Sequence, residues 1–123
     1  MSERLSIGSH RFTSVYVMDK PGAGGACHKY FIDKAELEEE DQPRDRYGFV
    51  AFQSGPVKEN GVNGCHQEDL LAIVIHRLRS FQAGLLACHE NAQALTNLEK
   101  AMHWLNHRTA DRQNRGVAGT NTL

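Results

Sequence analysis

The sequence predicts an α+β protein in which a small N-terminal antiparallel β-sheet is followed by a long antiparallel α-helical hairpin. Near Gln67 the apolar pattern changes from short strand-like segments to a helical period, and only a few residues separate the two helical segments. We expect residues 1–64 to form the β-strand region and residues 65–123 to form the hairpin with a C-terminal tail. A length of 123 residues suits one compact unit.

Three strand-like segments precede the helices. Residues 11–18 alternate roughly between apolar and polar side chains, and residues 27–32 and 47–53 are rich in aromatic and β-branched side chains. The acidic stretch within residues 33–46 predicts a solvated loop or a short surface helix. Residues 54–64 are rich in glycine and asparagine, which predicts a loop with several left-handed or tight backbone positions.

Two helices are predicted in the second half. The first covers residues 67–82 and ends before Gly84, which suits a helix C-cap. The second begins near Cys88 or His89, continues for about seven turns and ends at Gly116. The short connection requires the two helices to fold back on each other.

The apolar face of each helix is wider than the stripe that one partner helix covers. We therefore expect a homo-oligomer that buries the remainder. The apolar positions are Leu70, Leu71, Ile73, Val74, Ile75, Leu78 and Phe81 in the first helix and Ala94, Leu95, Leu98, Ala101, Met102, Trp104 and Leu105 in the second.

The composition excludes several classes of protein. The formal net charge of -1 argues against a DNA- or RNA-binding protein, because such proteins carry a positive excess. No apolar run approaches the roughly 20 residues of a membrane span, and the polar N-terminus does not resemble a signal peptide. Three cysteines with no sign of export predict reduced thiols in a cytoplasm.

Three arginines share one face at the end of the second predicted helix. Arg108, Arg112 and Arg115 are spaced i, i+4, i+7, and guanidinium groups match phosphate oxygens well. Arginines are also favoured at a helix C-terminus by the helix dipole, and Asp111 or Glu99 could pair with them. The spacing alone leaves both interpretations open.

Three further features have similarly open interpretations. The glycines of residues 116–120 would allow backbone N–H groups close to a ligand, or the segment is a frayed tail. Arg77 precedes Phe81 by one turn, so the two either hold a phosphate and stack a base, or Arg77 extends to solvent. Asn91, expected near Phe81 across the turn, either caps the helix or meets the edge of a ligand.

No motif predicts catalysis, a metal or a cofactor. There is no C-x-x-C, H-E-x-x-H, Walker loop or G-x-G-x-x-G, and no nucleophile with a positioned base is recognisable. The cysteines and histidines leave open an enzymatic alternative to a binding protein, namely an enzyme that degrades cyclic nucleotides. These residues include Cys27-His28, Cys65-His66, Cys88-His89, His103 and His107.

The helical half resembles a known family, the hairpin domain of phage sponge proteins. This domain is shared by the Thoeris anti-defence proteins of type one and the type-two anti-CBASS sponge, and the β-containing first half resembles the former. The resemblance covers roughly residues 47–123. It is carried by the motifs Glu-Asn-x-x-Ala-Leu from Glu90 and Arg-Thr-x-Asp-Arg-x-x-Arg-Gly-Val-x-Gly-Thr from Arg108.

The resemblance implies sequestration without turnover. Such a protein binds glycocyclic ADP-ribose made by bacterial Thoeris TIR proteins, binds CBASS cyclic di- or trinucleotides at a separate site, and assembles into dimers and hexamers. It acts in the cytoplasm of the infected bacterial host. A purely structural or protein-interaction hairpin is a further alternative.

The resemblance also implies two sets of site residues. At the cyclic ADP-ribose site, Phe81 would stack the adenine and Asn91 would form a hydrogen bond to the ligand. Gln82, which follows Phe81 in the matching segment, is expected at the same site. Arg77 is assigned to this site from its position on the helix alone, not from the resemblance. Ala118 stands where the family often has Glu, so the second site is weaker here if that carboxylate orders the tail. The residues implied or expected at the cyclic oligonucleotide site are Arg108, Thr109, Arg112, Arg115, Gly119 and Thr120.

Overall fold

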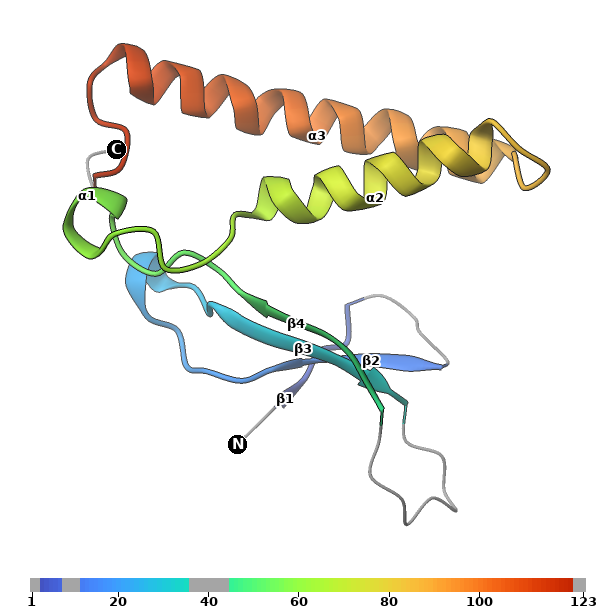
Figure 1. Cartoon of the computed structure of the whole chain (residues 1–123), viewed down its shortest axis with the longest axis horizontal. Coiled ribbons are helices and arrows are strands. Elements are labelled where there is room, and N and C mark those ends of the chain that lie inside the picture. The colour runs from blue at the N-terminus through green and yellow to red at the C-terminus, as the bar shows by residue number, and fades with distance from the viewer. Residues whose placement is uncertain (1–2, 8–11, 36–44, 121–123) are drawn as a thin grey trace. The chain divides into compact units, whose positions relative to one another are not determined.

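The computed structural model describes residues 3–7, 12–35 and 45–120. It confirms the predicted α+β class, because a four-stranded antiparallel sheet precedes the helices (Figure 1). The chain divides into two compact units, Met1–Cys65 and His66–Leu123. Most of the predicted acidic loop or surface helix lies outside the described residues.

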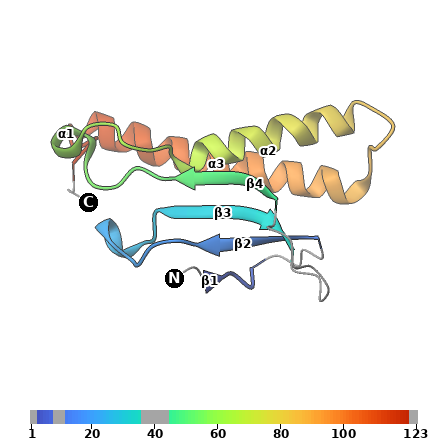
Figure 2. The same cartoon turned by 60° about the horizontal axis from the view of Figure 1, so that its bottom comes forward.

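The sheet of the first unit has the strand order β1-β2-β3-β4, and each neighbouring pair is antiparallel (Figure 2). Strand β1 is only two residues long and lies at the edge, where no sequence pattern indicated it. The other three strands were expected, with ends that differ by a few residues. The bounds are β1 Glu3–Arg4, β2 Thr13–Val17, β3 Lys29–Lys34 and β4 Arg46–Ala51.

The turn between β2 and β3 explains why β3 begins later than its apolar pattern suggested. The carboxylate of Asp19 accepts hydrogen bonds from the backbone N–H groups of His28, at 3.0 Å, and Lys29, at 3.1 Å. These bonds lower the pKa of Asp19 below its ordinary value of 3.8, with the bond from His28 as the main cause. A short 3-10 turn, Ala23–Gly25, lies within this connection. Asp19 therefore closes the β2–β3 connection.

One face of the sheet is built around Phe31, which is buried in β3. The ring of Tyr16 stacks on it with 4.9 Å between centroids, and the guanidinium carbon of Arg46 lies 3.9 Å from the Phe31 centroid. Arg46 Nε also donates to Asp33 Oδ1 at 2.8 Å. Since the Asp33 residue is only 8% exposed, this pairing compensates a charge that would be costly to bury alone.

The segment predicted as a loop over residues 54–64 contains one helical turn, α1, at Val57–Asn60. The side chain of Asn63 bridges this segment, because its Oδ1 accepts from Ser54 N and its Nδ2 donates to Ser54 O, each at 2.8 Å. Gly55 and Gly61 have φ values of 80° and 69°, which confirms the expected left-handed positions.

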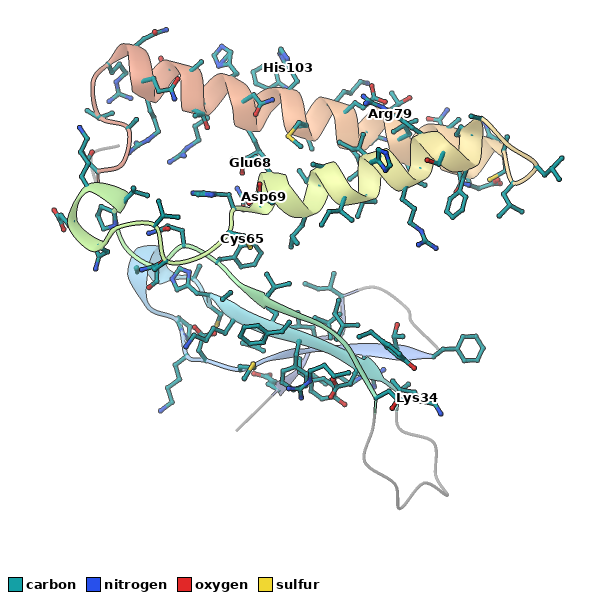
Figure 3. All side chains as sticks on the ribbon, viewed as in Figure 1. Lys34, Cys65, Glu68, Asp69, Arg79 and His103 are labelled. Carbon is teal, nitrogen blue, oxygen red and sulfur yellow. The ribbon has the colours of Figure 1, made fainter. Side chains whose placement is uncertain are left out.

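The second unit is the predicted antiparallel helical hairpin (Figure 1). Helix α2 spans Gln67–Gln82, which confirms the predicted ends, and α3 spans His89–Asn114 with Cys88 as its N-cap. Helix α3 ends two residues before Gly116, where φ is 73°. Asp69, labelled in Figure 3, accepts a hydrogen bond from His66 N at 2.9 Å and so caps the start of α2.

The hairpin leaves much of its apolar surface exposed. Within the described part of this unit only Ile75 is buried. By contrast, Ile73 and Leu86 are each 65% exposed, and Trp104 is 66% exposed. The predicted excess of apolar surface is therefore present in a single copy of the chain.

Candidate ligand sites on the helical hairpin

Gln82, at the last position of α2, closes the turn that joins the two helices. Its Oε1 accepts from Cys88 N at 3.0 Å and its Nε2 donates to Cys88 O at 3.2 Å. Asn91, in the first turn of α3, donates from Nδ2 to Leu86 O at 3.4 Å, and its backbone N–H donates to Cys88 Sγ at 3.4 Å. The two polar residues predicted to bind cyclic ADP-ribose thus both hold the same turn.

Phe81 lies beside this turn, next to Gln82 in the chain, and its side chain is half-buried. The guanidinium carbon of Arg77 lies 5.0 Å from the centroid of the Phe81 ring. This distance is typical of a cation–π pair. The structure therefore brings together the cation and the aromatic ring that the helical spacing placed one turn apart.

This end of the hairpin offers the groups that a nucleotide requires. An aromatic ring can stack a base, and a guanidinium can pair with phosphate oxygens. Among the described residues nothing donates a hydrogen bond to Asn91 Oδ1, so this oxygen can accept one from a ligand. The arrangement contains a stacking surface, a cation and a hydrogen-bond acceptor.

The three arginines near the end of α3 have different surroundings. Arg112 Nη2 donates to Val117 O at 3.2 Å and to Thr120 O at 2.9 Å. Arg115 Nη1 lies 3.4 Å from Asp111 Oδ2, which bears out one of the two expected carboxylate partners. Arg108 is exposed, and within the described parts of the chain its side chain has no hydrogen bond or ion pair.

Thr109 and Glu99 form contacts that the sequence did not indicate. Thr109 Oγ1 donates to Leu105 O at 3.1 Å, a common bond for a threonine within a helix. Glu99 Oε1 lies 3.8 Å from Arg79 Nε, so it pairs with α2 and not with the arginines at the end of α3. This contact links the two helices.

The segment after α3 folds back on the helix end. Val117 N donates to Arg112 O at 3.0 Å, and Thr120 donates to Val117 O from both its N, at 3.1 Å, and its Oγ1, at 2.5 Å. Gly116 and Gly119 have φ values of 73° and 77°, which glycine adopts without strain. Residues 117–120 are half-buried, unlike a frayed tail.

The cysteines and histidines do not converge in the part of the chain that the structure describes. No group of three or more potential metal ligands occurs among these residues. The rings of His103 and His107 lie 6.5 Å apart between centroids, with Trp104 contacting both. The Cys88 sulfur caps α3.

In the same described part of the chain no helix is long and apolar enough to span a membrane.

Fold and site together define a class: an α+β protein whose helical hairpin carries a cation and an aromatic ring beside its turn and arginines at the end of α3. Residues 45–110 match the family described as Acb2/Tad1, hairpin domain. Because this match covers more than half of the 123 residues, the chain belongs to that family. The matched region includes Phe81, Asn91 and Arg108 and ends before Arg112.

A relative supports the same assignment. The chain is 58% identical over 71 residues to Thoeris anti-defense 1 of Bacillus phage SBSphiJ7. The similar region is 58% of this chain and 50% of the relative. The chain therefore spans about half the length of the curated relative that it matches.

Proposed function

We propose that this protein is a phage anti-defence sponge that binds glycocyclic ADP-ribose and sequesters it without degrading it. The observation that carries the proposal is the 58% identity to a protein named Thoeris anti-defense 1. The signal would come from Thoeris TIR proteins, and the sponge would act in the cytoplasm of the infected bacterial host. Binding alone would keep the signal from its effector.

The geometry at the hairpin turn supports this ligand. The adenine would stack on Phe81, and the diphosphate would pair with Arg77, whose guanidinium already lies over the ring. Asn91 Oδ1 would accept a hydrogen bond from the ligand, while Gln82 fixes the turn through Cys88. Base, phosphate and polar edge would thus each meet a suitable group.

The other end of α3 supports a second site, for CBASS cyclic di- or trinucleotides. Arg108 offers an exposed guanidinium, and the ordered segment with Gly119 and Thr120 brings backbone groups to the same helix end. Arg112, Thr109 and Arg115 complete the proposed set. A phosphate-rich ring suits such a concentration of positive charge, even though the whole chain has a net charge of -1.

Self-association would bury apolar side chains that one copy of the chain leaves exposed. Trp104, Ile73 and Leu86 are each at least 65% exposed, and apolar surface of this kind is favourably buried between copies. We propose a homo-oligomer, a dimer or a hexamer. Its formation would explain how a hairpin with so small a core of its own is stabilised.

Calorimetry followed by chemical analysis of the ligand tests the proposal. The full chain is titrated with glycocyclic ADP-ribose, the complex is denatured by heat, and the released ligand is identified by mass spectrometry. We expect tight binding and intact cyclic ligand. Recovery of a linear product would instead support an enzyme that degrades cyclic nucleotides, and the absence of binding would support a structural hairpin.

A further inference from the structure

His103 and His107 form a pair of neighbouring imidazoles on α3. They are four residues apart, so their side chains project from one face of the helix, and their ring centroids lie 6.5 Å apart. Both residues are exposed. Figure 3 shows His103 on the side of α3 that faces away from α2. The pair is therefore not part of the packing between the two helices.

The ring nitrogens of both histidines are available as metal ligands. Within the described ranges, none of them takes part in a hydrogen bond or an ion pair. Glu99 and Asp111 lie four residues before and after the pair, on the same stripe of the helix, and each is paired with an arginine. A metal ion at this stripe would thus meet unoccupied imidazole nitrogens, while the neighbouring carboxylates are already engaged by cations.

Trp104 limits the motion of both imidazoles. The centroid of its ring lies 5.5 Å from that of His103 and 5.8 Å from that of His107. Because one indole contacts both rings, fewer side-chain conformations remain to be lost when an ion joins them. The pair is therefore partly preorganised for chelation.

We propose that His103 and His107 of one chain chelate a divalent transition-metal ion. Two histidines at i, i+4 on one helix face also supply two of the zinc ligands in H-E-x-x-H metalloproteases. Zn–N bonds are about 2.0–2.1 Å long, so the two rings approach each other by rotation of their exposed side chains when the ion binds. No third potential ligand joins the pair among the described residues, and water fills the other positions of the ion.

The donor set determines which ions fit. Imidazole nitrogens favour Zn²⁺, Ni²⁺ and Cu²⁺, whereas Mg²⁺ and Ca²⁺ prefer oxygen ligands. The chelate also stabilises α3, because it joins two side chains that are neighbours only while this turn is helical. This site shares no residue with the proposed nucleotide sites, and the inference does not depend on the proposed function.

NMR of the histidine rings with Zn²⁺ as the probe tests the site in the full chain. The ring signals of His103 and His107 should shift together when Zn²⁺ is added, should return when EDTA is added, and should not respond to Mg²⁺. The chain has seven histidines, so the other rings serve as internal references. Shifts of equal size at all of them would show non-specific coordination and overturn the proposal.

Single substitutions test whether the two imidazoles act as one chelate. His103→Gln and His107→Gln replace exposed side chains with a good helix former, and His76→Gln is the matched control at an exposed histidine of α2. Each of the first two should raise the Kd for Zn²⁺ at the remaining ring of the pair at least about tenfold, since the second ligand no longer adds to the first. His76→Gln should leave it unchanged. An unchanged Kd in His103→Gln or His107→Gln would overturn the chelate.

Co-expression of His103→Gln and His107→Gln tests whether both ligands come from one copy. An oligomer that contains both variants still carries one intact histidine of each kind. We expect no recovery of tight Zn²⁺ binding in this mixture. Recovery would show that two copies share the ion and would overturn a chelate within one chain.

Hydrogen exchange tests the effect of the ion on the helix. With saturating Zn²⁺, the amides of residues 103–107 should exchange about tenfold more slowly in the unaltered chain and should not change in His107→Gln. Unchanged exchange in the unaltered chain would overturn the stabilising role of the ion.

Discussion

The guanidinium carbon of Arg77 lies 5.0 Å from the centroid of the Phe81 ring, and both residues project from α2. A base that stacks on this face must displace the guanidinium, which would then lie beside the phosphates of the same nucleotide. A base that stacks on the opposite face would find the ring already supported by a cation. Under the proposed function, recognition of the base would therefore be coupled to the position of the Arg77 guanidinium at this end of the hairpin.

Phe81→Ala should weaken the binding of glycocyclic ADP-ribose by about tenfold to a hundredfold, because base–aromatic stacking contributes ~1–3 kcal/mol. The Kd of cyclic triadenylate should not change, since the proposed oligonucleotide site shares no residue with the proposed site at Phe81. Calorimetry with both ligands measures this. Phe49→Ala removes a ring that is 55% exposed in the first unit and serves as the control. Equal loss of both ligands in Phe81→Ala would contradict two separate sites.

Gly64→Ala should destabilise the fold by about 1–3 kcal/mol, the typical cost of overpacking. A Cβ at this position would lie 2.5 Å from the carbonyl carbon of Phe52 and 2.6 Å from Ala51 O. Gly84→Ala is the matched control, since its Cβ would be 3.7 Å from the nearest atom. Urea denaturation should show a large loss for the first variant and little for the second; similar losses would contradict the close approach.

Asp19→Asn should destabilise the protein in a pH-dependent way. The folded-state pKa of Asp19 is lowered, so its contribution to stability is fully present above the ordinary value of 3.8 and is lost as the pH falls through the folded value. The difference in unfolding free energy between the two chains should be constant at neutral pH and shrink in acid. Asp45→Asn, at an exposed position, is the control. A difference that does not change with pH would contradict this role.

Trp104→Glu should disrupt self-association, because it places a charge on the exposed apolar face of α3, where Trp104 is 66% exposed in one copy. Light scattering after size exclusion should give an oligomer for the unaltered chain and a smaller species for the variant. Gln113→Glu adds the same charge elsewhere on α3 and should leave the mass unchanged. An unchanged mass for Trp104→Glu would show that this face lies outside the contact between copies.

Much of the fold could be predicted because the strongest signals are local. The apolar period and Gly84 determined both ends of α2, and Cys88 marked the start of α3. The start of β3 could not be predicted, because it depends on the Asp19 carboxylate ten residues away. Helix α1 was missed since a single turn is too short to show a period.

The site was predictable only where its contacts lie within one helix. Arg77 and Phe81 are one turn apart, so their approach follows from helical geometry. The bonds of Arg112 could not be inferred, because they require the chain to reverse at Gly116. The two bonds between Gln82 and Cys88 likewise depend on the conformation of the turn. The sequence showed only that these two residues lie on either side of a short connection.

The most direct test of the proposed sponge is to purify the full chain from cells in which a Thoeris TIR protein is making its signal. The protein is heated, and the released small molecules are identified by mass spectrometry, with Phe81→Ala purified in parallel. We expect intact glycocyclic ADP-ribose from the unaltered chain, in amounts approaching one ligand per site, and much less from the variant. Release of a linear product, or of no nucleotide at all, would contradict sequestration.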